Sequence, residues 1–288
     1  MAAPVFPTLV KPSMETLPES SPLRQMFPET FYSNGNYYSS PFGRVKYWIL
    51  GPADGKKIVL IHGISTPSFG FKNVAPELVK NGFQVLLYDL YARGYSEAPQ
   101  VSYDPNLYIT QLALLLQYIH WSNVNVVGMS MGGAVAAAFS AMFPHLVDEG
   151  VVFLAAAGMM VLPKPKQIQN QDPVAALNAQ STIDVTNQIR DLQTANLPGY
   201  QEAITSSLKG GIITGVHWAY ETLGKTTDKR FLIFHGTADP TVPYGEALKI
   251  KELIPQAELV SITGAGHALV IEEGVWEDMT KKIITFFA

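Results

Sequence analysis

Short runs of apolar residues recur along the chain and are separated by segments with helical spacing. Each apolar run is typical of a strand that is buried on both faces of a sheet. The runs lie at residues 57–63, 83–90, 124–128, 150–158, 230–236 and 258–262, and the helical patterns lie at 74–82, 107–119, 131–143 and 275–287. Because strands alternate with helices, the pattern predicts an α/β fold with a mostly parallel central sheet and helices on both faces.

Two further segments precede these units. Residues 31–40 and 44–50 have the composition of antiparallel strands, and Asn34-Gly35 has the residue types of a hairpin turn. The first 28 residues contain six prolines, which remove backbone donors and fix φ. We therefore expect an N-terminal arm, residues 1–28, that lies extended on the surface of the domain.

The alternation stops between residues 158 and 228. This stretch contains helical patterns at 181–193 and 199–210 but no convincing strand. A loop of this length without structure would be unusual. The pattern therefore predicts a helical cap (158–228), inserted after the sixth strand and folded over the edge of a core that comprises residues 29–157 and 229–288.

Composition limits the classes of function. The chain has 288 residues, of which 47% are hydrophobic and 15% are charged, so it is long enough for one globular domain with a large core. A net charge of −4 gives no basic surface for nucleic acid, and no apolar stretch approaches the length of a membrane span. Cysteine is absent, which excludes disulfides, thiolate metal sites and cysteine nucleophiles. The N-terminus lacks the pattern of a signal peptide, so we expect a cytoplasmic protein, although a processed form would have lost its leader.

A serine with glycines on both sides follows one of the predicted strands. Ligands of parallel α/β sheets bind at the carboxyl ends of the strands, and Ser130 follows the strand at 124–128. Its surroundings, Gly-Met-Ser-Met-Gly, fit the G-x-S-x-G pattern, and a helix of small residues comes next, as in the sharp turn that presents a nucleophilic serine. We expect a strained backbone there, with room left by the glycines. The alternative interpretation is a glycine-rich turn with an inert serine.

A serine hydroxyl needs a base, and the base needs an acid that orients it. His267 lies in a glycine-containing loop after the last core strand, and Asp239 lies shortly after the strand at 230–236. The order Ser130, Asp239, His267 is the chain order expected for this type of turn. The alternatives are a loop histidine with only structural bonds and an Asp-Pro turn residue. Glu272 and Glu273, close after His267, are expected to be solvated residues at a helix start.

Acyl transfer also needs hydrogen-bond donors for the oxyanion that forms on the substrate. The expected donors are the backbone N–H of Met131, directly after the serine, and that of Ile64, in the loop after the strand at 57–63. His62 and His235 each precede a glycine at a strand end. We expect these two histidines to brace their turns.

Five motifs in the expected order extend this interpretation to most of the chain. They are LIHG, DLYARGYS, VVGMSMGG, HGTADPTVP and GAGHALVIEE. Together they resemble the α/β-hydrolase superfamily in its single-domain, cap-bearing branch, which includes serine esterases, monoacylglycerol lipases and carbon–carbon bond hydrolases. The resemblance implies the α/β-hydrolase fold and a Ser130–Asp239–His267 catalytic triad. It also implies that Asp89 and Arg93, in the second motif, are a structural brace.

Several methionines lie close to the candidate nucleophile in the sequence and in the predicted fold. Met129, Met159 and Met160, together with His217 and Trp218 of the cap, are expected to contact substrate in an apolar pocket. Methionines also fill gaps in ordinary cores, and cap aromatics also pack against one another, so ordinary packing is the alternative.

The sequence thus predicts a serine hydrolase that cleaves small-molecule carboxylic esters through an acyl-enzyme. The acyl or alcohol part of the ester would be apolar, and no metal or organic cofactor is needed. A carbon–carbon bond hydrolase with the same triad is the first alternative, and a ligand sensor built on the same fold is the second. The sequence does not indicate the oligomeric state.

Overall fold

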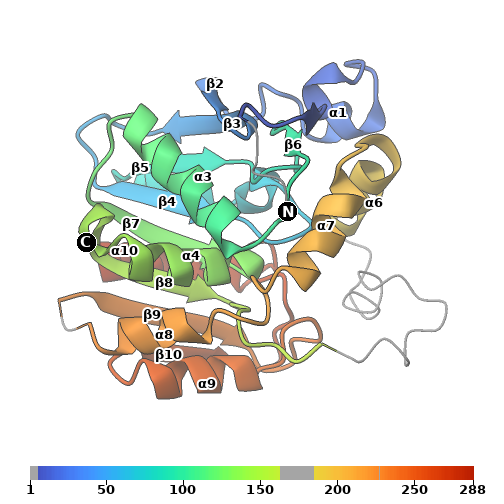
Figure 1. The fold of residues 1–288 in the computed structure, drawn as a ribbon. Helices are drawn as coiled ribbons and strands as arrows, with labels where there is room; N and C mark the ends of the chain where they lie inside the picture. Colours follow the sequence, from blue (N-terminus) through green and yellow to red (C-terminus); the bar gives the residue numbers. More distant parts are fainter. Residues whose placement is uncertain (1–5, 163–184, 227) are drawn as a thin grey trace.

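The chain folds around an eight-stranded sheet, with a separate two-stranded sheet beside it (Figure 1). A computed structural model describes residues 6–162, 185–226 and 228–288. The strand order in the main sheet is β10-β9-β8-β7-β4-β5-β3-β2, and β1 pairs with β6 in the small sheet. The strands are β1 (Val10–Lys11), β2 (Gly35–Ser40), β3 (Gly43–Leu50), β4 (Lys57–Ile61), β5 (Gln84–Tyr88), β6 (Ala98–Pro99), β7 (Val124–Met129), β8 (Val147–Leu154), β9 (Arg230–Gly236) and β10 (Glu258–Ile262).

Most of the main sheet is parallel. The six strands β10, β9, β8, β7, β4 and β5 pair in parallel, whereas β3 pairs antiparallel with both β5 and β2. The central strands β4, β5 and β7 are almost entirely buried, because each is covered on both faces and contains consecutive Val, Ile or Leu residues. These observations confirm the predicted fold class.

Helices cover both faces of the sheet. On one face α3 and α4 pack together, α4 packs on β7 and β8, and α8 packs between α4 and α9; Figure 1 shows these four helices in front of the sheet. On the other face α2 and α10 contact each other. The helices are α1 (Pro22–Met26), α2 (Val74–Lys80), α3 (Pro105–Tyr118), α4 (Met131–Met142), α6 (Val185–Asn196), α7 (Tyr200–Lys209), α8 (His217–Gly224), α9 (Gly245–Leu253) and α10 (Trp276–Phe287), with short 3₁₀ turns at Met14–Thr16, Ser68–Phe71 and Pro144–Leu146.

The predicted hairpin exists, but the predicted position of its turn is wrong. Strands β2 and β3 are antiparallel, and their register places Ser40 opposite Gly43, so the turn is Pro41-Phe42. The Ser40 hydroxyl builds this turn, since its Oγ accepts the Phe42 N–H at 3.0 Å and donates to the Gly43 carbonyl at 2.7 Å. Asn34 does adopt a positive φ of 58°, but it does so where the chain enters β2.

The N-terminal arm is more deeply packed than predicted. It contains the helix α1, which begins at Pro22 with Ser21 as its cap; proline is tolerated there because the first turn needs no N–H partner. Met14, Leu23 and Phe27 are fully buried, so the expectation of an extended surface segment is wrong for this part of the arm.

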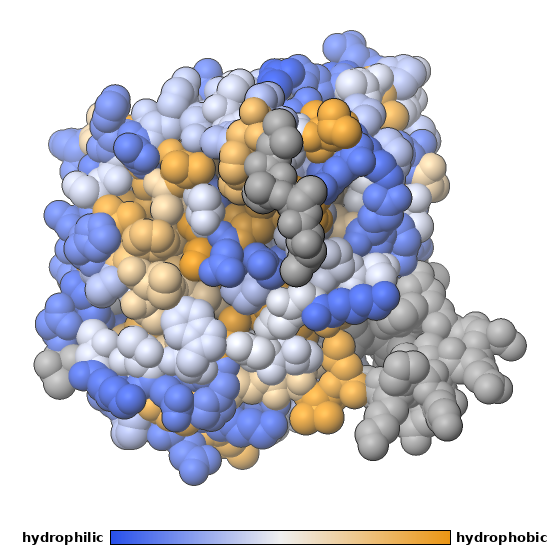
Figure 2. Space-filling view, in the orientation of Figure 1, coloured by the Kyte–Doolittle hydropathy of each residue, from blue (hydrophilic) through white to orange (hydrophobic). Residues whose placement is uncertain are grey.

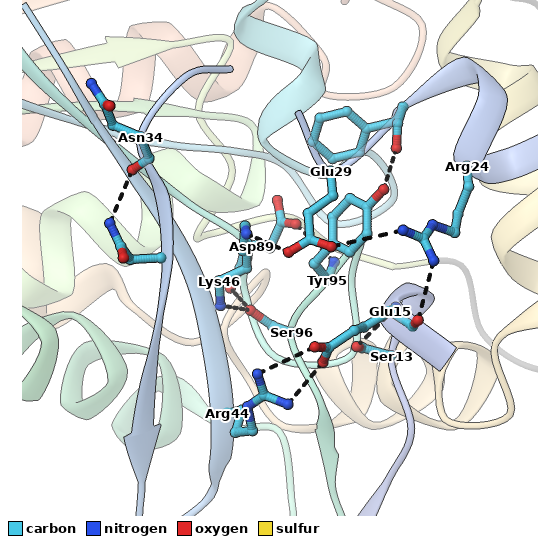
Figure 3. Close-up of polar contacts among 12 residues, drawn as sticks. Ser13, Glu15, Arg24, Glu29, Asn34, Arg44, Lys46, Asp89, Tyr95 and Ser96 are labelled. Atoms are coloured by element: carbon cyan, nitrogen blue, oxygen red, sulfur yellow. Dashed lines mark hydrogen bonds and ion pairs between the residues drawn. The ribbon is translucent and has the colours of Figure 1, made fainter. Parts of the chain in front are cut away.

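Ion pairs tie the arm to β3 (Figure 3). Arg44 pairs with Glu15 at 2.8 Å, and Lys46, whose side chain is 2% exposed, pairs with Glu29 at 2.8 Å. Both basic residues lie on β3, so the Arg44–Glu15 pair fixes the arm, and the Lys46–Glu29 pair fixes the residue that directly follows it, against the antiparallel end of the sheet.

The segment between β8 and β9, residues 158–228, is here called the insertion. Its described helices are α6, α7 and α8, and Figure 1 shows α6 beside α1, with α7 next to α6. Helix α8 instead packs against α4 and α9 on one face of the sheet. The division into core and cap stays a prediction. Within the insertion, helix α8 packs with the helices that cover the sheet.

The surface seen in Figure 2 mixes hydrophilic residues with separate hydrophobic patches. Among the described residues, no helix is both long and apolar enough to cross a membrane.

Candidate active site

Ser130 occupies a strained turn between β7 and α4. Its φ is 56° and its ψ is −122°, a region that costs a non-glycine residue about 1–3 kcal/mol. Its N–H donates to the Leu154 carbonyl at 2.9 Å, and its own carbonyl accepts the N–H groups of Gly133 at 2.9 Å and Ala157 at 3.0 Å. The bonds to Leu154 and Ala157, at the end of β8 and just after it, and the bond to Gly133 of α4 hold the backbone in this conformation. The positive φ confirms the strain predicted from the sequence.

The glycines around Ser130 are required by backbone contacts. A Cβ added to Gly128 would overlap the Gly132 carbonyl, and one added to Gly132 would overlap the carbonyls of Ile61 and His62. Helix α4 therefore approaches β4 with backbone against backbone. Gly63 also lies against the serine, since its added Cβ would be 3.3 Å from Ser130 Cβ and 3.7 Å from Oγ.

His267 and Asp239 form a close pair. Asp239 follows β9 and His267 follows β10, the neighbouring parallel strand, so both side chains lie at the carboxyl edge of the sheet where β7 also ends at Ser130. His267 Nδ1 lies 2.7 Å from Asp239 Oδ2. Because a carboxylate accepts only, this contact assigns the proton to Nδ1 and leaves Nε2 of the neutral ring able to accept a proton.

Asp239 is buried yet stabilised as a carboxylate. Its Oδ1 accepts the N–H groups of Thr241 at 2.8 Å and Val242 at 2.9 Å. Burial raises the pKa of Asp239, but hydrogen bonds from His235 and His267 outweigh it, so the pKa lies below its ordinary value. The side chain therefore carries a full negative charge beside His267.

His235 is a partner of Asp239 that the sequence interpretation did not identify. Its Nε2 donates to the Val242 carbonyl at 2.8 Å, which confirms the expected brace, and lies 3.4 Å from Asp239 Oδ2. The signal available in the sequence was the spacing of four residues between His235 and Asp239 across the turn after β9.

The loop that begins at His62 is held by the hydrogen bonds of this histidine, which is neutral. His62 Nε2 accepts the Leu90 N–H at 2.9 Å, so Nδ1 carries the proton and donates to the Gly63 carbonyl at 2.8 Å. Burial lowers the pKa of His62 to about 3, against a smaller opposing effect of the Gly63 bond, and nearby Arg93 lowers it further. His62 is therefore neutral, and it braces the turn as predicted.

The expected oxyanion donors lie on the two segments that flank Ser130. Met131 is the first residue of α4 and is fully buried, and half-buried Ile64 follows Gly63, which contacts the serine. The part of both N–H groups in chemistry stays a prediction.

The expected pocket residues divide into two groups. Met160 is buried, and Met129 and Met159 are half-buried and packed against the core. His217 and Trp218 instead lie on the surface at the start of α8, with His217 Nδ1 3.5 Å from Glu221 of the same helix. A contact of these two side chains with substrate stays a prediction.

No three His, Asp or Glu side chains of the described part of the chain are arranged to hold a metal ion.

Asp89 and Arg93, the expected structural brace, are both fully buried. Asp89 accepts hydrogen bonds from Ser68 and Tyr95, and Arg93 donates to the Ile64 carbonyl.

Comparisons with known proteins agree with this arrangement. A family described as having the alpha/beta hydrolase fold matches residues 56–274. A 2-hydroxy-6-oxo-2,4-heptadienoate hydrolase of Pseudomonas putida is 26% identical over 239 residues, which cover 76% of this chain and 85% of the relative.

Solved structures show the same fold. A bromoperoxidase from Bacillus anthracis superposes with a TM-score of 0.72 at 22% identity, over 88% of this chain and 99% of that chain. An esterase from Rhodococcus sp. superposes with a TM-score of 0.67 at 20% identity, over 88% of this chain and 98% of that chain. With the family match, the strained serine turn and the strand order, these similarities place the chain in the alpha/beta hydrolase fold family.

Proposed function

We propose that this hydrolase cleaves carboxylic esters through an acyl-enzyme on Ser130. The observation that carries the proposal is the 2.7 Å contact of His267 Nδ1 with the ionised, buried Asp239, at the sheet edge where Ser130 occupies its strained turn. A neutral imidazole held in this tautomer is the base that a serine hydroxyl needs.

In the proposed reaction, His267 Nε2 takes the proton of Ser130 Oγ as Oγ attacks the ester carbonyl carbon. The carbonyl oxygen becomes an oxyanion and is stabilised by the N–H groups of Ile64 and Met131. The intermediate collapses when the bond to the alcohol oxygen breaks and His267 returns the proton to that oxygen. A water molecule, deprotonated by His267, then attacks the acyl carbon, and a second oxyanion forms at the same donors. When the bond from that carbon to Ser130 Oγ breaks, His267 gives the proton to Oγ, so the acid is released and the serine hydroxyl is restored.

The apolar surroundings of the serine support an ester with an apolar acyl or alcohol part. Met129 and Met131 flank Ser130, and Met159 and Met160 follow shortly after Ala157, whose N–H bonds to the Ser130 carbonyl. Met131 and Met160 are buried, and Met129 and Met159 are half-buried. Thioether side chains adapt to apolar groups of different shape. The fold of a Rhodococcus esterase is the same, at an identity that supports the fold alone.

A second candidate is hydrolysis of a carbon–carbon bond next to a ketone with the same triad. It is favoured by the similarity to the Pseudomonas putida heptadienoate hydrolase, which covers 76% of the chain. Both reactions would use Ser130, Asp239 and His267, so they differ in substrate and not in the residues that react.

Covalent labelling with a fluorophosphonate tests the nucleophile, and a panel of p-nitrophenyl esters from acetate to long acyl chains tests the substrate class. We expect one adduct on Ser130 and turnover of about 1–10³ s⁻¹ on the best ester. Ser130→Ala should abolish both. Ser140→Ala is the matched control, because this buried serine lies on α4 and its hydroxyl has no partner among the described residues.

The outcomes separate the two candidates. Labelling of Ser130 with negligible turnover of every ester, but cleavage of a vinylogous 1,5-diketone, would replace the ester proposal with the carbon–carbon one. A folded protein that takes no label at Ser130 would refute both.

A further inference from the structure

The loop at residues 63–65 has three consecutive carbonyls that each accept a side-chain donor. The Gly63 carbonyl accepts His62 Nδ1 at 2.8 Å, and the Ile64 carbonyl accepts Arg93 Nε at 2.9 Å. The Ser65 carbonyl accepts two donors, Gln193 Nε2 and Tyr200 Oη, each at 2.9 Å. Such a run of side-chain bonds is unusual for a loop, because most backbone carbonyls in proteins bond to other backbone groups.

These bonds fix the direction of the N–H groups as well. A trans peptide is planar, so the carbonyl of one residue and the N–H of the next point to opposite sides. The bond from His62 to the Gly63 carbonyl therefore sets the direction of the Ile64 N–H, and the bond from Arg93 to the Ile64 carbonyl sets the next peptide. The two donors at the Ser65 carbonyl fix the third peptide, at the end of the loop away from β4.

The donors to Ser65 belong to the insertion, whereas His62 and Arg93 belong to the core. Gln193 lies on α6 and is fully buried, and Tyr200 begins α7 and is 1% exposed. Gln193 also accepts the Gly94 N–H through its Oε1 at 2.9 Å, so one amide side chain connects two core loops. A second contact runs in parallel, since Arg93 reaches Ser207 of α7 at 3.3 Å.

We infer that Gln193 and Tyr200 are positioning residues for the Ile64 N–H, so that the insertion controls how well the oxyanion is stabilised. This inference rests on the proposed function, in which that N–H binds the oxyanion. The two side chains donate to the Ser65 carbonyl and so restrict rotation of the peptide planes in residues 63–65. Loss of either bond leaves the loop in place through His62 and Arg93, but with greater freedom at one end. The consequence is a slower chemical step with unchanged substrate binding.

Two variants remove the bonds with little change in volume. Tyr200→Phe removes only the hydroxyl. Gln193→Glu keeps an acceptor for the Gly94 N–H and replaces the donor to Ser65 with a carboxyl group, which donates only while it is protonated. Tyr103→Phe is the matched control, because Tyr103 is 4% exposed and its hydroxyl has no partner within the described ranges.

The readouts are kcat, KM and the inhibition constant of a trifluoromethyl ketone that matches the best ester. The ketone forms a hemiketal oxyanion on Ser130, whereas the product acid binds without one. We expect each variant to lower kcat about 5- to 20-fold, which is less than the 10²–10³-fold loss for removal of a whole oxyanion donor. KM and the inhibition constant of the product acid should change less than about twofold, and the ketone should bind more weakly in proportion to kcat.

The Gln193→Glu variant adds a signature in pH. Its defect relative to the native enzyme should deepen as pH rises and the carboxyl group ionises, whereas the defect of Tyr200→Phe should follow the native profile. Tyr103→Phe should match the native enzyme in every measurement.

Failure of the inference is distinguishable from failure of the proposed function. If Ser130 takes the fluorophosphonate label and the esters turn over, but both variants retain native kcat and native ketone affinity, the inference is wrong and the proposed function stands. Equal losses in ketone and product binding would also overturn it, because they indicate a damaged pocket. Absence of label on native Ser130 would remove the proposed function itself.

Discussion

Two buried aspartates at the carboxyl ends of parallel strands have pKa values that are shifted in opposite directions. Asp89 directly follows β5 and is fully buried, and Asp239 follows β9 and is 8% exposed. Burial raises the pKa of Asp89 to about 6, although backbone and hydroxyl donors of Tyr95 and Ser68 oppose the rise. For Asp239, burial acts in the same direction, but the hydrogen bonds from His235 and His267 prevail and lower the pKa.

The difference comes from the partners and not from the position in the fold. Asp89 accepts hydrogen bonds from neutral donors: the Ser68 N–H and hydroxyl at 2.9 and 2.7 Å, and the Tyr95 N–H at 2.9 Å. Asp239 Oδ2 instead lies 2.7 Å from His267 Nδ1 and 3.4 Å from His235 Nε2, so its partners are two imidazoles. A carboxylate at a strand end is therefore a brace or a member of a reacting group according to the donors that surround it.

The largest expected effect separates the two aspartates by activity. In Asp239→Asn the amide group faces His267 Nδ1 and favours the tautomer with the proton on Nε2, which is unable to act as a base. We expect kcat on the best ester to fall by about 10⁴-fold. Asp89→Asn should keep kcat within about threefold of the native value at 25 °C, because Asp89 contacts no reacting group. Steady-state kinetics on both folded variants check this, and an equal loss of kcat in the two would contradict the division of roles.

A smaller effect concerns stability. Ser68→Ala removes the hydroxyl that donates to Asp89 Oδ1 but keeps the backbone N–H that donates to the same oxygen. A hydrogen bond to a charged group contributes about 1.5–3 kcal/mol, so we expect the free energy of unfolding to fall by about 2 kcal/mol at pH 7. Urea unfolding measures the change, with Ser140→Ala as the control for loss of a buried serine hydroxyl without a described partner. An unchanged midpoint would mean that Asp89 gains little from this donor.

The smallest effect is the dependence of stability on pH. The pKa of Asp89 is higher in the folded chain, about 6, than its ordinary 3.8, so the folded state holds the proton more tightly and loses stability as pH rises between these values. Between pH 5 and pH 7 this loss amounts to about 1 kcal/mol. The advantage of the native chain over Asp89→Asn in unfolding free energy should therefore shrink by about 1 kcal/mol over that range.

Asp239 should behave differently in the same measurement. Its pKa is lowered on folding, so its contribution to stability is present above pH 3.8 and is lost only as pH falls below that value. The advantage of the native chain over Asp239→Asn should stay constant between pH 5 and pH 7. A parallel pH trend in both variants would show that the two carboxyl groups do not differ as described.

Local sequence patterns predicted those parts of the molecule that short-range geometry decides. The strain at Ser130 follows from glycines and a strand-to-helix junction, and the Asp239–His267 pair follows from the places of β9 and β10 in a parallel sheet. The predicted position of the first hairpin turn is wrong, because the Ser40 side chain stabilises a turn at Pro41-Phe42. This stabilisation outweighs the preference of Asn-Gly for such turns.

Contacts between segments that lie far apart in the chain could not be predicted from the sequence. The burial of Phe27 in the arm and the bonds from Gln193 and Tyr200 to Ser65 join residues far apart in the chain. In a single sequence, a buried glutamine on a helix is not distinguishable from an exposed one. The contact of His235 with Asp239 was closer to prediction, since the two are only four residues apart, but it depends on the path of the turn after β9.

The backbone contact of α4 with β4 has a consequence for mutational scans. Any side chain at Gly132 would overlap the carbonyls of Ile61 and His62, and any side chain at Gly128 would overlap the Gly132 carbonyl. In a saturation library screened for turnover, both positions should therefore be intolerant of every substitution, as Ser130 should be. The three would be told apart by yield of soluble protein: inactive variants at Ser130 should accumulate at native levels, and those at the two glycines should not.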